Sequence, residues 1–208
     1  MSADIPASLV KELRDRTGAG FSDCKRALVD SGGDMEKAVD ILRTRGLADA
    51  AKRAGTAAGE GLVEAYLHQT DPDLPPKIGV MVELNCQTDF VAKSPEFRTL
   101  AREIALQVAA MRPRWVSKDQ VTQDVLDRER QILMASDIVS GKPPGVVEKI
   151  VEGKLASLMT DPGGALLEQS WWRDEKQTVG EMVQEVAAKV KENVLVRRFV
   201  RFRVGEVD

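Results

Sequence analysis

The chain has 208 residues, 43% apolar and 30% charged, so it can bury a sizeable core and exceeds the commonest size of a single domain. Its 33 acidic and 30 basic residues nearly cancel to a formal net charge of -3. This balance gives no bulk attraction to polyanions, so we expect no direct nucleic-acid partner. One small and one medium domain is the expected organisation.

The first residues lack both the basic start and apolar run of a signal peptide and the arginine-rich character of a transit peptide. No apolar stretch has membrane-spanning length. The two cysteines, Cys24 and Cys86, lie far apart and form no Cys-x-x-Cys pair, which favours free buried thiols in a reducing compartment. We therefore expect a cytoplasmic protein without a membrane partner.

Residues 6–46 are predicted to form three short helices, because apolar residues recur at helical spacing and turn-forming residues separate them. Glycines near 18 and 33 end the first two helices, and Asp34 can cap the third. The predicted inner positions are Leu9, Val10, Leu13, Cys24, Ala27, Leu28, Met35, Ala38, Ile41 and Leu42. So small a module has a marginal core. We expect a docking head, domain 1–54, and not a catalytic scaffold.

A second domain is expected to span 55–208, because residues 52–61 are small, polar and rich in glycine, as in a flexible connection. Strict alternation from Ile78 to Cys86 predicts a half-buried strand. The stretch 62–68 is expected to pair with it through the proline-rich loop 71–76, giving a hairpin over 62–86.

Helices are predicted to follow this hairpin. Ser94 and Pro95 begin a long one, whose inward stripe comprises Phe97, Leu100, Ala101, Ile104, Val108 and Met111. Two more are expected around 119–138 and 145–159, and a capping box of Thr178 and Glu181 opens the last, with Met182, Val183, Val186 and Val190 inward. A strand over 194–204 ends the chain. The fold class is α+β, a small antiparallel sheet packed by helices.

No motif for catalysis or metal binding is present in the sequence. His68 is the only histidine, and two separated cysteines do not make a zinc site. Phosphate-binding loops of the Walker type and Gly-x-Ser-x-Gly elbows are both missing. We therefore expect a protein that is not an enzyme and needs no cofactor or metal.

Phe90 stands out, because the strand ending at Cys86 runs straight into a polar turn that carries this aromatic residue. One interpretation is that Phe90 belongs to the core, as most phenylalanines do. The other is that the turn holds the ring outward as an anchor for a partner's pocket. The sequence pattern alone leaves both open.

The C-terminal strand alternates basic and apolar residues. Strict alternation places Val194, Val196, Val200, Phe202 and Val204 on one face with Arg198, and Arg197, Arg201 and Arg203 on the other with Leu195 and Phe199. A half-buried strand explains this pattern. An RNA-binding adaptor that uses the arginines and aromatics is the alternative. Trp171 and Trp172 are expected to serve packing or a subunit contact.

Two stretches, residues 13–28 and 83–93, resemble the two signature segments of the elongation factor Ts family. The similarity continues in family order through 141–143, 148–154, 166–169 and 196–199. The resemblance implies a ubiquitin-associated-like (UBA-like) three-helix head and an α+β core. It also implies guanine-nucleotide exchange: binding the GDP form of elongation factor Tu (EF-Tu), disturbing its Mg²⁺ and phosphate site, and so releasing GDP for GTP loading.

The resemblance also implies which residues contact EF-Tu. The matching positions are Thr88, Asp89, Phe90 and Val91 in one signature and Arg14, Phe21 and Lys25 in the other. In the family the aromatic of the first set enters the GTPase near its magnesium. Phe21-Ser22 departs from the family, whose members often have two large hydrophobic residues there. A single core unit, as in short-type members, implies a homodimer, with the C-terminal strand as the candidate contact. That strand has Val200 and no cysteine, so we expect the dimer to be non-covalent.

Overall fold

The structure, a computed structural model, describes residues 5–71 and 73–206. Residues 1–4, 72, 207 and 208, which the predicted domains and hairpin loop include, lie outside the described residues. The helices are α1 (Ala7–Thr17), α2 (Phe21–Asp30), α3 (Met35–Arg53), α4 (Asp89–Ala92), α5 (Pro95–Met111), α6 (Gln123–Met134), α7 (Pro144–Thr160) and α8 (Val179–Val190). The strands are β1 (Glu60–His68), β2 (Ile78–Cys86), β3 (Ser170–Trp171), β4 (Asp174–Thr178) and β5 (Leu195–Arg203). Short 3-10 turns cover Lys118–Gln120 and Leu166–Glu168.

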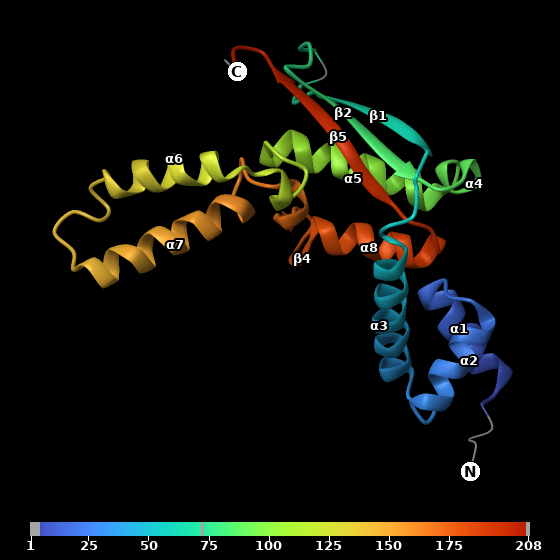
Figure 1. Cartoon of the computed structure of the whole chain (residues 1–208). Coiled ribbons are helices and arrows are strands. Elements are labelled where there is room, and N and C mark those ends of the chain that lie inside the picture. Colours follow the sequence, from blue (N-terminus) through green and yellow to red (C-terminus); the bar gives the residue numbers. More distant parts are fainter. Residues whose placement is uncertain (1–4, 72, 207–208) are drawn as a thin grey trace.

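Helices α1 to α3, called the head below, confirm the three helices predicted at the start of the chain. Gly18 ends α1 in the left-handed region at φ 69°, where a side chain would be strained, and Asp34 caps α3 by accepting the Lys37 N–H. Their small core contains Val10, Leu13, Cys24, Ala27, Leu28 and Ala38. Helix α3 is longer than expected and runs from the head to the sheet domain (Figure 1). Its Ala50 belongs to the core of that domain, and Gly46 lies against Ala188 of α8.

The larger domain is built on a three-stranded antiparallel sheet in the order β1-β2-β5. The hairpin prediction is confirmed, with Leu62 of β1 opposite Leu84 of β2. Alternate residues of β2 are buried as the two-residue period predicted, namely Val80, Val82, Leu84 and Cys86. Helix α5 covers this face of the sheet (Figure 1), and its predicted stripe is buried except for Met111, which is half-buried.

Helix α8 packs between α3 and α5 and ends beside the head. The predicted capping box is present at its start, where Thr178 Oγ1 accepts the Glu181 N–H and the Glu181 carboxylate accepts the Thr178 N–H. Lys191, at φ 60°, ends the helix in the left-handed region. The chain then turns directly into β5.

Helices α6 and α7 form a pair that projects away from the sheet (Figure 1). A separate small cluster of Val139, Val151 and Leu155, with Leu133 of α6 packed against it, joins this pair. The helix predicted around 119–138 is present as α6, but it is shorter at both ends, and a 3-10 turn at Lys118–Gln120 precedes it. Ser136 Oγ donates to the Leu133 carbonyl just beyond the helix, a local bond that competes with a further helical turn.

The hairpin β3–β4 is absent from the sequence prediction. Its second strand is Asp-Glu-Lys-Gln-Thr, which has no apolar alternation to indicate a strand. Trp171 packs against the main core, as expected for a packing residue. Trp172 is 44% exposed under the Arg173 guanidinium, whose carbon lies 4.3 Å from the ring centroid. For this second tryptophan, the subunit contact stays a prediction.

The predicted faces of the C-terminal strand are wrong beyond Val196. The register shifts so that Leu84 pairs with Val196 but Glu83 pairs with Arg198, which leaves Arg197 in a bulge. One extra residue inverts every following side chain. Phe199 and Arg201 therefore face inward, whereas Val200 and Phe202 are exposed on the open face with Arg198.

Candidate protein-binding site

Phe90 lies on the one-turn helix α4 at the end of the sheet (Figure 1), and its side chain is 81% exposed. It is the most exposed of the large apolar side chains described. The interpretation of Phe90 as a core residue is therefore wrong. An aromatic ring in solvent exposes apolar area that a partner's pocket can bury.

The neighbours of Phe90 hold its backbone in place. Thr88 caps α4 by accepting the Val91 N–H at 3.4 Å, and Val91 itself packs against the main core. The Cys86 thiol donates to the Thr88 carbonyl at 3.2 Å. Burial raises the pKa of this thiol, with the Glu192 charge adding to the effect, so it remains a neutral donor. The ring of Phe90 is exposed, whereas Thr88 and Val91 on either side of it are fixed by contacts with the rest of the chain.

Asp89 and Lys93 flank the exposed ring. Lys93 Nζ donates to Asp89 Oδ2 at 2.5 Å across one helical turn. This bond is the main cause that lowers the pKa of Asp89 and raises the pKa of Lys93. Both side chains are at least half exposed, so the pair contributes little to folding. Its charges remain available to a partner.

Arg14, Phe21 and Lys25 are all exposed on the first two helices of the head. Phe21 begins α2 and is 52% exposed, and Lys25 is one turn further along the same face. Arg14, near the end of α1, is also exposed. Among the described residues, neither Arg14 nor Lys25 has an ion-pair partner. The structure thus presents an aromatic residue and two uncompensated cations on this helix pair.

The two sets of residues lie at the same end of α8. Lys191 Nζ contacts Asp23 Oδ2 of α2 at 3.2 Å, and Lys189 Nζ contacts Glu96 Oε1 of α5 at 3.4 Å. The Lys191 bond is the main cause that lowers the pKa of Asp23. A carboxylate that the sequence did not point to, Glu192, also reaches the turn that carries Phe90. No local pattern signals it, because the contact spans more than a hundred residues.

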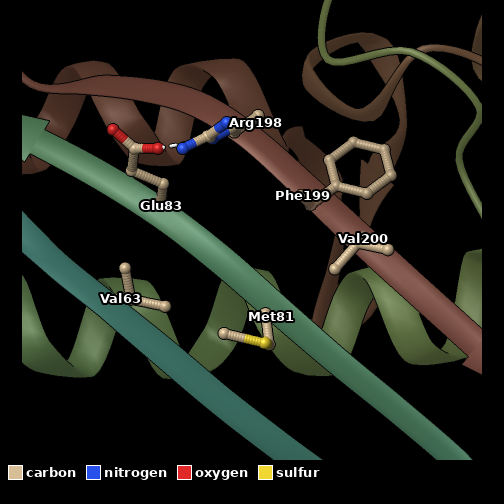
Figure 2. Close-up of a pocket in the computed structure, with 6 residues that line it drawn as sticks. All are labelled: Val63, Met81, Glu83, Arg198, Phe199 and Val200. Atoms are coloured by element: carbon tan, nitrogen blue, oxygen red, sulfur yellow. Dashed lines mark hydrogen bonds and ion pairs between the residues drawn. The ribbon is translucent and has the colours of Figure 1, made fainter.

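Two concave regions occur elsewhere on the described surface. A cleft of about 500 Å³ separates the head from α8, but several of its charged residues are already paired, as in Arg43–Glu185 and Arg26–Asp23. A shallower depression of about 270 Å³ lies on the open face of the sheet. Figure 2 shows Val63, Met81 and Val200 lining it from three strands, beside the Glu83–Arg198 pair.

Neither of these two concave regions has a histidine or a cysteine among its lining residues. Within residues 5–71 and 73–206, no group of three or more His, Cys, Asp or Glu side chains could hold a metal ion. Cys24 and Cys86 are free and buried, as predicted. None of the described helices is both long and apolar enough to cross a membrane.

Comparison with known proteins identifies the family. The model of the family described as elongation factor TS matches residues 49–206, which include α4, α8 and the whole sheet. The chain belongs to the elongation factor Ts family. It is 51% identical to elongation factor Ts of Caldanaerobacter subterraneus over 97% of this chain and 98% of that protein.

Other elongation factor Ts relatives match over a similar length. That of Carboxydothermus hydrogenoformans is 52% identical over 97% of this chain and 90% of its own, and that of Fervidobacterium nodosum is 49% identical over 98% and 100%. Membership of the elongation factor Ts family places the chain among the elongation factors of translation. The family model begins inside α3, so Arg14, Phe21 and Lys25 lie outside the segment it matches.

Proposed function

We propose that this chain is the guanine-nucleotide exchange factor of EF-Tu in the cytoplasm. It binds the GDP form of EF-Tu, disturbs the Mg²⁺ and phosphate contacts of the nucleotide, and allows GTP to load after GDP leaves. The observation that carries the proposal is Phe90, which is 81% exposed on a turn whose backbone is anchored from several sides. Membership of the elongation factor Ts family supports it.

The mechanism follows from thermodynamic linkage. If Phe90 enters a pocket that opens only when the Mg²⁺ and phosphate contacts are broken, the factor and GDP weaken each other's binding equally. A coupling of a few kcal/mol suffices, because each ~1.4 kcal/mol changes an equilibrium constant tenfold. No covalent step and no cofactor of this chain is required.

The other site residues have distinct roles in this proposal. Thr88 and Val91 hold the turn from the protein side, and Asp89 offers a carboxylate beside the ring. Arg14, Phe21 and Lys25 form a second contact, in which one aromatic and two unpaired cations meet the GTP-binding domain of EF-Tu. The head thus adds affinity, whereas the turn carries out the exchange.

Release of labelled GDP from purified EF-Tu, followed by stopped-flow fluorescence, tests the proposal. We expect the release rate to rise with the concentration of this chain and then saturate, since a ternary complex forms before GDP departs. A release rate that does not change at any concentration of the chain would contradict the proposal.

The structure weakens the RNA-binding alternative, because two of the four arginines of β5 are already paired within the chain. Arg198 Nε donates to Glu83 at 2.6 Å, and Arg201, with its side chain 8% exposed, is bound to Glu206. These arginines therefore do not form a free basic stripe with stacking aromatics. Filter binding that showed tight RNA affinity falling steeply with salt would restore the alternative.

A second copy of this chain is the proposed partner for the open face of the sheet. Side chains of three strands form rows there: Val63 with Glu83 and Arg198, and Met81 with Val200. Leu67 and Phe202, 67% and 69% exposed, flank Gly79 in the next row. Two such faces can stack as a sandwich about 10 Å apart. Because Glu83 and Arg198 neutralise each other within one chain, they can enter that interface without an unpaired charge.

A further inference from the structure

Helix α4 depends on its surroundings for its shape. It has four residues, and a single helical turn has no stability of its own in water. The position of Phe90 is therefore imposed by whatever fixes the turn that precedes it. Thr88 and Cys86 provide local contacts, but both are part of the same short segment.

One carboxylate from a distant part of the chain satisfies the donors at the start of this turn. Glu192 Oε2 accepts the backbone N–H groups of Gln87 and Thr88, each at 3.0 Å. Its other oxygen, Oε1, accepts the Thr88 hydroxyl at 2.6 Å. Hydrogen bonds to an ionised acceptor are stronger than neutral ones, and a shared acceptor fixes the two amides relative to each other.

The residues beside Glu192 fix where this carboxylate lies. Lys191 occupies the left-handed position that ends α8, where glycine is the usual residue, and its side chain reaches Asp23 of the head. Asn193 is 9% exposed, and its Nδ2 donates to the carbonyls of Ala54 at 3.3 Å and Thr56 at 2.7 Å. Its N–H donates to Gln87 Oε1 at 3.3 Å. Three consecutive residues thus join the head, the α3–β1 connection and the Phe90 turn.

We propose that Glu192 is a positioning residue for nucleotide exchange, which presets the turn so that Phe90 meets its pocket without first being ordered. This inference rests on the proposed function. When a loose segment becomes ordered on binding, the loss of conformational entropy weakens association. Contacts that already order the segment in the free protein remove this cost. Asn193 supports the position of Glu192, because its side chain is hydrogen-bonded to the segment that connects α3 to β1.

The test compares Glu192→Ala with Glu192→Gln. Alanine removes all three acceptor contacts. Glutamine keeps one oxygen for the two N–H groups, and its amide can donate to the Thr88 hydroxyl oxygen. Two measurements are made on each variant: hydrogen exchange at the Gln87 and Thr88 amides in the free chain, and the rate of GDP release from EF-Tu. Glu175→Ala, which removes an exposed carboxylate of β4, is the matched control.

We expect Glu192→Ala to speed amide exchange at Gln87 and Thr88 and to slow GDP release about tenfold, because the turn must then be ordered when it binds EF-Tu. Glu192→Gln should lie within about threefold of wild type, since neutral bonds are roughly half as strong as charge-assisted ones. Glu175→Ala should match wild type. If Glu192→Ala does not fold, Glu192→Asp, whose shorter side chain withdraws the carboxylate from Gln87 and Thr88, takes its place with a smaller loss in the same direction.

The results separate this proposal from the exchange function itself. Wild-type release rates in Glu192→Ala, or unchanged amide exchange at Gln87 and Thr88, would overturn the positioning role. A wild-type chain that does not accelerate GDP release would overturn the proposed function, whereas amide exchange would still report whether Glu192 braces the turn.

Discussion

Gln107 of α5 and Gln169 are both fully buried and joined side chain to side chain, Gln107 Nε2 donating to Gln169 Oε1 at 3.3 Å. Gln107 also donates to the Ser170 carbonyl at 3.1 Å and accepts the Trp172 N–H at 3.0 Å. Gln169 Nε2 donates to the Asp161 carbonyl. The network fastens the polar β3–β4 hairpin to the helix that covers the sheet.

Replacing Gln107 with leucine should lower the free energy of unfolding by about 1–3 kcal/mol, because it leaves buried polar groups without partners. Urea denaturation measures the change. Gln131→Leu, at an exposed position of α6, should stay within about 0.5 kcal/mol of wild type. Equal urea midpoints for the Gln107 variant and wild type would show that the hydrogen-bond network does not contribute to the stability of the fold.

Phe21→Ala should weaken binding to EF-Tu without lowering the maximal rate of GDP release. The ring is 52% exposed at the start of α2, so its loss removes contact area in the complex and leaves the Phe90 turn intact. We expect the half-saturating concentration to rise about tenfold, or ~1.4 kcal/mol. Val29→Ala, at the opposite end of the same helix and 37% exposed, is the control. An unchanged half-saturating concentration for Phe21→Ala argues against a contact at the head.

Asp34 should make the head sensitive to acid. The Lys37 backbone N–H is the main cause that lowers the pKa of Asp34 from 3.8. Because the folded pKa is below the unfolded one, the stabilisation is complete above about pH 4 and is lost as the pH falls through the lowered folded value. Asp34→Asn keeps a capping oxygen that does not titrate.

Chemical denaturation of wild type and Asp34→Asn between about pH 6 and pH 2 measures this effect. The difference in unfolding free energy between them should favour wild type most at the higher pH and shrink as acid protonates Asp34. Protonation of the other carboxylates lowers the unfolding free energy of both proteins by the same amount. Only the difference between the two proteins therefore reports on Asp34. A difference that is constant across this range contradicts the assignment.

Met81→Asp should convert a dimer into a monomer. Met81 is 50% exposed at the middle of the open sheet face, where a second copy would place it in an apolar interface (Figure 2). Burying an unpaired carboxylate in that interface would make the free energy of dimer formation less favourable. Leu74→Asp, at an equally exposed residue of the β1–β2 loop, should leave the dimer intact. Light scattering after size-exclusion chromatography measures the mass. A monomeric wild type, or a dimeric Met81→Asp, contradicts the proposed homodimer.

Most of the fold follows from local signals. Asp34, Ser94 and Thr178 mark helix starts by capping chemistry, and the alternation of β2 shows which of its side chains are buried. The bulge at Arg197 is not visible in the sequence, because it depends on pairing with a strand more than a hundred residues away. Its effect is large, since it reverses which side chains of β5 face outward.

The candidate site was predictable in part. The position of Phe90 on a turn followed from the strand pattern, but whether the ring faced in or out depended on tertiary contacts, and only the family resemblance favoured the outward direction. The 81% exposure of the ring agrees with that expectation. Glu192 was missed because its three bonds to Gln87 and Thr88 join segments with no sequence pattern in common.

Phe90→Ala in the stopped-flow GDP-release assay tests the central claim most directly. The side chain is exposed, so the variant should unfold within about 0.5 kcal/mol of wild type. Trp172→Ala, which removes another exposed aromatic, is the control and should release GDP at the wild-type rate. Trp172 lies in the β3–β4 hairpin before the start of α8, whereas the turn before α4 is contacted from just beyond the end of α8. We predict that Phe90→Ala leaves GDP release near the rate of EF-Tu alone. Full wild-type acceleration by Phe90→Ala would contradict the account.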